Sequence, residues 1–221
     1  MIKVIPTTEQ LRRATRLSNN LPLFSTSITK NRYGRHGLLA EILYAESGLL
    51  PPHVEFETKK PQLYDHDLID PRTGITFEVK TRVMNARALP PPPFYSVHLS
   101  EHSCTKQNPD WFLFAMCDRQ CTTFYLLGAM RNEDKYSLTG RKLRKAGQSG
   151  DWFVHRSVNT YPISALTPLH DFKDTLLKDV KSISESRELD EGAEEGPCLR
   201  CKPHCPAIHS KIQEAGRVSS I

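Results

Sequence analysis

Residues 64–83 constrain the fold of this chain more than any other segment. They predict two strands joined by a turn that contains Gly74. Side chains alternate along a strand with a period of two, so Glu78 and Lys80 project from one face of the second strand. Asp67 belongs to the first strand. The hairpin is therefore expected to gather two carboxylates and one ammonium group at one of its ends.

Two carboxylates in this position are suited to a hard divalent cation. Mg²⁺ prefers oxygen ligands and takes only one or two protein carboxylates, with water and substrate phosphate in its other positions. We expect Asp67 and Glu78 to bind Mg²⁺ (or Mn²⁺), helped by the main-chain carbonyl of Val79. Lys80 would orient or deprotonate the attacking water, or stabilise the transition state, and the sequence leaves these roles open.

The pattern resembles the PD-(D/E)xK phosphodiesterase superfamily, which has the restriction-endonuclease-like fold. Asp67 matches the first acid of the motif, and Glu78-Val79-Lys80 matches E-x-K. The first acid lacks its preceding proline, and Asp65 and Asp70 compete with Asp67 for its role. We prefer Asp67 because two apolar residues follow it directly, as is usual in the motif.

Two neighbouring segments extend the resemblance over roughly residues 34–130. Residues 34–46 predict a helix with Glu41 in its middle, and the helix that precedes the motif in this superfamily often carries an acid. Residues 108–115 are similar to the apolar strand that often follows the motif. The resemblance implies an α/β fold in which helices flank a mixed central sheet. It also implies a Mg²⁺-dependent DNA nuclease, expected to be an endonuclease, with Asp67, Glu78, Lys80 and Glu41 as catalytic residues.

The remaining secondary structure completes a domain over residues 1–181. A first helix is expected at 7–17, with Thr7 or Thr8 as its N-cap. Strands are expected at 54–58, 63–69, 75–83, 95–99, 111–117, 122–129 and 152–158. A closing helix is expected at 165–181, with an apolar stripe for the core formed by Leu166, Leu169, Phe172, Leu176, Leu177 and Val180.

The C-terminal part has a different composition. Residues 182–197 are expected to form a flexible acidic linker, because they are rich in Ser, Glu and Gly and poor in large apolar residues. Residues 198–221 form a Cys/His-rich tail. Its spacing is compact enough for a structural Zn²⁺ site, in which the four ligands would be Cys198, Cys201, Cys205 and His209.

Three alternatives for this tail remain open. His204 could replace His209 as the fourth ligand. An iron–sulfur cluster is a second alternative, because some nucleases of the superfamily hold one with C-terminal cysteines and one earlier cysteine. The earlier cysteine would be Cys104, Cys117 or Cys121. In the third alternative the thiols bind no metal.

The charge distribution fits a phosphate-rich partner. The chain has a net charge of +5, and residues 1–180 contain 24 Lys and Arg against 18 Asp and Glu. Affinity for nucleic acid comes largely from counterion release at such cations. One basic group precedes the Glu41 helix and another lies between two predicted strands. The residues expected to contact DNA are Arg32, Arg35, Arg141, Lys142, Arg144 and Lys145.

The sequence predicts no membrane span and no signal peptide, so we expect a cytoplasmic protein, of a kind that suits a phage, plasmid or bacterium. A homodimer would suit cleavage of two strands, and the tail could recruit a protein partner. Two other functional classes remain open. The first is a non-catalytic DNA-binding or partner-recruiting protein that retains the nuclease fold. The second is an unrelated α/β interaction protein, in which the three motif residues would point apart.

Overall fold

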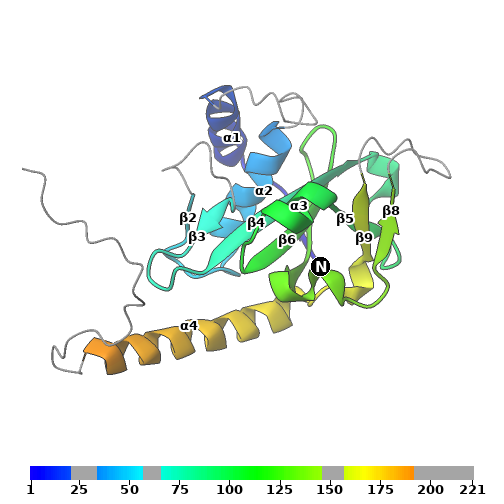
Figure 1. Ribbon diagram of the computed structural model, residues 1–221. Coiled ribbons are helices and arrows are strands. Elements are labelled where there is room, and N and C mark those ends of the chain that lie inside the picture. Colours follow the sequence, from blue (N-terminus) through cyan, green and yellow to red (C-terminus); the bar gives the residue numbers. More distant parts are fainter. Residues whose placement is uncertain (21–33, 57–65, 146–156, 192–221) are drawn as a thin grey trace, which may run out of the picture. The chain divides into compact units, whose positions relative to one another are not determined.

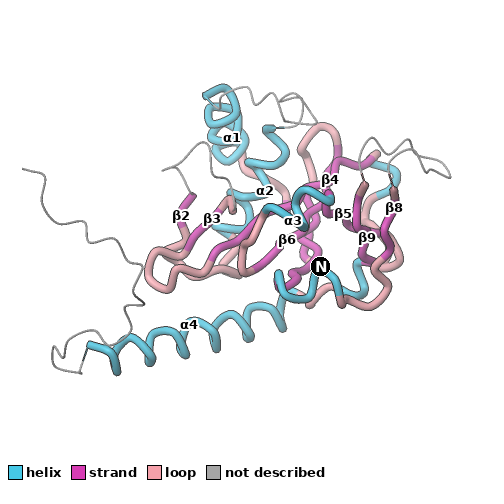
Figure 2. The backbone as a smooth tube through the Cα atoms, viewed as in Figure 1, coloured by secondary structure: helices cyan, strands magenta, loops and turns pink. Residues whose placement is uncertain are grey.

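A curled, six-stranded mixed sheet organises the protein (Figures 1 and 2). The computed structural model describes residues 1–20, 34–56, 66–145 and 157–191. All neighbouring strands of this sheet are antiparallel except β4 and β6, which are parallel. In spatial order the strands are β1 (Ile2–Val4), β7 (Phe124–Arg131), β6 (Trp111–Asp118), β4 (Thr76–Met84), β3 (Leu68–Ile69) and β2 (Glu55–Phe56).

A second, three-stranded antiparallel sheet is inserted in the connections around β6 and β7. Its order is β5 (Ser96–Ser100), β9 (Val158–Pro162) and β8 (Lys142–Arg144). The α-helices are α1 (Thr8–Asn20), α2 (Gly34–Glu46), α3 (Glu101–Lys106) and α4 (Leu169–Glu191). Short 3₁₀ helices lie at η1 (Ala86–Ala88), η2 (Asn132–Tyr136) and η3 (Ile163–Ala165). By internal contacts the chain divides into two units, Met1–Ile183 and Ser184–Ile221.

Strand β6 lies between two apolar cores, and all eight of its residues are buried. Leu113 belongs to the core that contains α2 and the start of α4, where Trp111 meets Phe172 edge-on at 5.0 Å between ring centroids. Phe112 and Phe114 belong to the other core, with residues of β5 and β9. This alternation explains why the strand is apolar throughout, since each of its faces packs against protein.

Local sequence signals account for the first helix and for the hairpin turn. Thr7 and Gln10 form a capping box at the start of α1: the Gln10 N–H donates to Thr7 Oγ1 at 3.2 Å, and the Thr7 N–H donates to Gln10 Oε1 at 2.8 Å. In the β3–β4 turn, the Asp70 carboxylate accepts from the Thr73 hydroxyl at 2.8 Å and from the Arg72 N–H at 3.1 Å. Gly74 completes this turn with a φ of +79°, a conformation that suits glycine.

The structure confirms a mixed α/β fold and most of the predicted elements. The Glu41 helix lies at Gly34–Glu46, as predicted, and the three strands of the predicted meander pair in sequence order. None of the helices in the described part of the chain is both long enough and apolar enough to cross a bilayer.

Two predictions of secondary structure were wrong in detail, and a third falls largely outside the described residues. The basic segment expected between strands contains strand β8, because Leu143 pairs with Asn159 of β9. The described strand β9 is Val158–Pro162, whereas most of the predicted range 152–158 lies outside the described residues. The last helix begins at Leu169, after the buried Leu166, and its Leu177 is 46% exposed rather than in the core.

The same helix continues to Glu191, so residues 182–191, which we expected to be part of a flexible linker, are helical. Ser and Glu occur in helices as well as in linkers, so composition alone does not distinguish the two. Residues 192–197 and the Cys/His-rich tail lie outside the described residues.

Candidate functional site

Asp67 and Glu78 lie opposite each other at the start of the β3–β4 hairpin. The register pairs Leu68 with Phe77, and the Asp67 N–H donates to the Phe77 carbonyl at 2.9 Å, which extends the pairing by one residue. The Asp67 side chain then takes the place of a main-chain acceptor, because its Oδ2 accepts from the Val79 N–H at 2.7 Å. One oxygen of the carboxylate is thereby fixed by the backbone of the strand that carries Glu78.

Glu78 and Lys80 project from the same face of β4, as predicted, and their side chains are in direct contact. Lys80 Nζ donates to Glu78 Oε1. The alternate residues Phe77 and Val79 face the opposite way, into the core that contains α2 and the start of α4. Asp67, Glu78 and Lys80 therefore converge. The alternative of an unrelated α/β interaction protein predicted that these residues would point apart, and that prediction is wrong.

Gln107 is a fourth member of this site that sequence reasoning missed. Its Oε1 accepts from Lys80 Nζ at 2.9 Å, and its Nε2 donates to Glu78 Oε1 at 2.8 Å. Gln107 caps the end of α3, four residues before β6 begins at Trp111. Because β4 and β6 are parallel and pair Phe77 with Trp111, the residues that precede β6 lie beside the start of β4. Only knowledge of that pairing could have identified Gln107.

Glu41 shares the electrostatic environment of the other carboxylates. Burial raises the pKa of Glu41 to about 8, and the negative charge of Glu78 adds to this, whereas Lys80 acts in the opposite direction. Burial likewise raises the pKa of Asp67 well above its ordinary value, and the charges of Glu78 and Glu41 raise it further. No hydrogen bond joins Glu41 to the other site residues within the described ranges. In the absence of a cation, Glu41 and Asp67 therefore hold protons more tightly than exposed acids do.

Glu78 shows how these residues could hold a metal ion. Its side chain is 5% exposed, and its second oxygen, Oε2, is buried without a hydrogen-bond partner. A buried carboxylate oxygen without a partner is costly, and a cation would satisfy it. Asp67 also has a second oxygen besides the one bound to the Val79 N–H. Among the described residues, however, no group of three His, Cys, Asp or Glu side chains is arranged to hold a metal ion. A site built here would have two protein carboxylates and water, which is the arrangement that Mg²⁺ accepts.

The acids that compete with Asp67 for its role have different positions. Asp70 is 1% exposed, and its carboxylate is used by the β3–β4 turn through Thr73 and Arg72. Asp65 lies outside the described residues. The Val79 carbonyl stays a prediction as a metal ligand, because the contact with Asp67 is made by the Val79 N–H.

The residues predicted to contact DNA have different surroundings. Arg35 is exposed near the start of α2, where its charge and a hydrogen bond act on the Cys121 thiol. Arg141 packs inward: its Nε donates to Asn159 Oδ1 at 2.8 Å, and its guanidinium lies 5.2 Å from the centroid of the Tyr136 ring. Lys142, Arg144 and Lys145 are exposed, whereas Arg32 lies outside the described residues.

The cysteines of the described region are buried free thiols. Burial raises the pKa of the Cys117 and Cys121 thiols, which keeps both protonated at neutral pH. The Cys104 sulfur accepts from Asn159 Nδ2 at 3.1 Å. The metal ligands predicted in the tail, Cys198, Cys201, Cys205 and His209, lie outside the described residues, as does His204.

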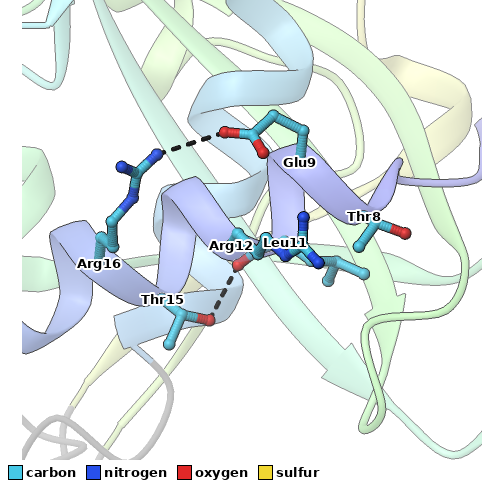
Figure 3. A pocket seen from close by; sticks show the side chains of 6 residues that line it. All are labelled: Thr8, Glu9, Leu11, Arg12, Thr15 and Arg16. Carbon is cyan, nitrogen blue, oxygen red and sulfur yellow. Dashed lines mark hydrogen bonds and ion pairs between the residues drawn. The ribbon is translucent and has the colours of Figure 1, made fainter.

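A pocket of about 570 Å³ is present elsewhere, along helix α1 (Figure 3). Two interactions join residues that line it: Arg16 pairs with Glu9 at 3.3 Å, and the Thr15 hydroxyl donates to the Leu11 carbonyl. The pocket shares no described residue with the carboxylate site. Its described lining residues are Thr8, Glu9, Leu11, Arg12, Thr15 and Arg16.

Comparisons with protein-family models, with curated proteins and with solved structures found no match to this chain.

Proposed function

We propose that the protein is a Mg²⁺-dependent deoxyribonuclease with a restriction-endonuclease-like core. The observation that carries this proposal is the environment of Glu78. One of its oxygens is held by Lys80 and Gln107, and the other is buried, without a partner, in a site that also contains Asp67. An unsatisfied, buried carboxylate oxygen beside other acids is unfavourable in an apoprotein and favourable when a cation binds.

Asp67 and Glu78 would hold the ion through the oxygens that face away from their protein donors, with Glu41 near enough to stabilise it by charge. When bound, Mg²⁺ supplies positive charge for the phosphate oxygens and lowers the pKa of water. Lys80 is 24% exposed, so its ammonium group can reach a phosphate from its position between Glu78 and Gln107. Its role is to hold the attacking water or to neutralise charge that develops on the phosphate during hydrolysis.

The contacts of Gln107 fix this geometry. A lysine that donated only to a carboxylate could rotate with it, whereas the Gln107 amide binds both partners at once. The amide carries no charge, so it orients Lys80 and Glu78 without changing the charge of the site. We therefore assign Gln107 a positioning role.

The test is cleavage of linear, circular and branched DNA with Mg²⁺, Mn²⁺ or EDTA. Glu78→Gln and Lys80→Ala should each abolish metal-dependent cutting. Glu78→Gln removes a metal ligand, and Lys80→Ala removes the ammonium group that contacts Glu78. Glu133→Gln is a matched control, since Glu133 is 74% exposed and lies outside the site. Cutting that persists in both site variants, or that proceeds equally in EDTA, would refute the proposal.

A specific observation favours a second candidate function, that of a non-catalytic DNA-binding protein. Glu78 Oε1 already accepts from both Lys80 and Gln107, which is also how a purely structural buried ion pair would be satisfied. That function predicts DNA binding without cutting of any substrate. It also predicts no stabilisation of the protein by Mg²⁺, which a thermal-unfolding measurement can detect.

A further inference from the structure

Basic side chains of the three-stranded sheet and of β4 form one surface, which we call the basic face: Arg82, His98, Lys142 and Arg144. The register aligns His98 of β5 with Thr160 of β9, and Thr160 with Lys142 of β8. Ser100, Val158 and Arg144 are aligned in the same way. Residues directly opposite on neighbouring strands share a face, and so do residues two apart on one strand. His98, Lys142 and Arg144 therefore lie on one face of this sheet, and all three are exposed.

The opposite face of the sheet is apolar. Val97 and Leu99 of β5 and Tyr161 of β9 are buried in the core that also contains Phe112 and Phe114. Arg141 belongs with that side, because its guanidinium binds the buried Asn159. Among the cations in and beside β8, Arg141 thus packs against the core side, whereas Lys142, Arg144 and Lys145 are exposed.

Arg82 joins the basic face from β4. Its Nη1 donates to the Ser96 carbonyl at 2.8 Å and lies 3.3 Å from His98 Nε2. Burial and the charge of Arg144 lower the pKa of Arg82, while Tyr95 acts in the opposite direction. Burial, Arg82 and Arg144 together lower the pKa of His98 to about 4. At neutral pH His98 is therefore uncharged and can accept a hydrogen bond from Arg82, so the positive charge of this face comes from the arginines and Lys142.

The positive charges of Arg82 and Arg144 lie close enough to repel one another. Neither Lys142 nor Arg144 forms an ion pair with any described carboxylate. Neighbouring cations that repel one another are stabilised when an anionic ligand binds beside them. A polyanion is the ligand that fits best, because the positive charges come from β4 and β8, which belong to different sheets, and therefore spread over a surface.

We propose that the basic face binds the phosphodiester backbone of the DNA that enters the carboxylate site. This inference rests on the proposed function for its choice of DNA. Lys80 and Arg82 are two residues apart on β4, so both project from one face at a spacing of about 6.6 Å. The strand thus runs from the carboxylate site directly into the basic face, and Figure 1 shows β4 leading toward β5. Contacts of this kind position the backbone and read no base sequence.

The experiment measures binding of a short fluorescein-labelled DNA duplex by fluorescence anisotropy in EDTA, over a series of salt concentrations. Arg82→Gln/Arg144→Gln should weaken binding by about tenfold or more and reduce the slope of log K against log[salt] by about 2, one unit for each lost phosphate contact. Lys173→Gln/Lys178→Gln on α4 removes the same charge from two other exposed positions and should change neither quantity appreciably. The proposal would be overturned if Arg82→Gln/Arg144→Gln lost no more affinity than this control. It would also be overturned if the wild-type protein bound no DNA.

Arg82 is partly buried, so its substitution could also disturb the fold. A second variant, Lys142→Gln/Arg144→Gln, changes only exposed residues and should again lower the affinity and the salt slope; unchanged binding in this variant would also refute the proposal. Cleavage is measured separately with Mg²⁺. A protein that binds through the basic face and cuts nothing would refute the nuclease only. A protein whose cutting and binding both survive these substitutions would refute the basic face only.

Discussion

Glu41 provides the sharpest test of the electrostatics of the site. Its pKa in the folded protein is about 8, against an ordinary value of 4.5. The folded apoprotein therefore holds a proton on Glu41 over a pH range in which the unfolded chain has lost it. Stability from this group is greatest below the unfolded pKa and falls as the pH rises toward the folded pKa, because the unfolded state binds fewer protons. Glu41→Gln removes the titration and should flatten that fall.

The difference between the two pKa values corresponds to at most about 5 kcal/mol above pH 8. This figure is an upper limit because Glu41 is only partly buried, so solvent screens its charge. We expect Glu41→Gln to stabilise the apoprotein by about 1–3 kcal/mol at high pH and to change its stability little below about pH 5.

The assay is urea unfolding in EDTA at several pH values, followed by the same series with Mg²⁺. In the wild type, Mg²⁺ should restore much of the stability lost at high pH, by about 2.7 kcal/mol when its concentration is a hundred times its Kd. The gain from Mg²⁺ should be smaller in Glu41→Gln. Glu46→Gln is a control on the same helix, since Glu46 lies in an exposed ion pair with Arg13. Parallel stability curves for wild type and Glu41→Gln in EDTA would show that Glu41 does not titrate with a raised pKa.

Two further substitutions test a contact within the site and the packing of β7. Gln107→Leu removes both amide contacts to Lys80 and Glu78. We expect initial rates of DNA cleavage to fall by about 10- to 100-fold, and urea unfolding to show a stability loss of only about 1–2 kcal/mol. An unchanged cleavage rate would contradict the positioning role. Gly128→Ala should cost about 1–3 kcal/mol, because its Cβ would lie 2.8 Å from both Leu166 Cβ and the Thr167 carbonyl. Gly37→Ala, whose Cβ would meet only Glu41 Oε1 at 3.9 Å, is its comparison and should stabilise helix α2 or be neutral in the same unfolding measurement.

Local patterns in the sequence predicted the elements that carry the motif. The period-two alternation placed Glu78 and Lys80 on one face of a strand, and the Gly34–Glu46 helix was predicted with its observed bounds. Gly74 indicated the turn that joins β3 and β4. These features depend on residues close together in the chain, where steric and hydrogen-bond preferences act without help from the rest of the fold.

The features that the sequence did not predict depend on distant contacts. Gln107 reaches Glu78 only because β4 and β6 pair in parallel, and no local pattern encodes that pairing. The separation of Arg141 from Arg144 depends on β8 joining β9, which gives neighbouring cations opposite faces of a sheet. The helical extent of residues 182–191 was missed for another reason. A segment rich in polar residues can form either a helix or a linker, so its composition does not distinguish the two.

The position of β6 has a consequence during synthesis of the chain. Its eight residues contain seven apolar ones and are covered on both edges, by β4 and by β7. Until β7 has left the ribosome, one edge of β6 has no partner, and an apolar strand with a free edge is a template for intermolecular pairing. Fragments that end before Phe124 should therefore be prone to aggregate even though they contain every residue of the carboxylate site.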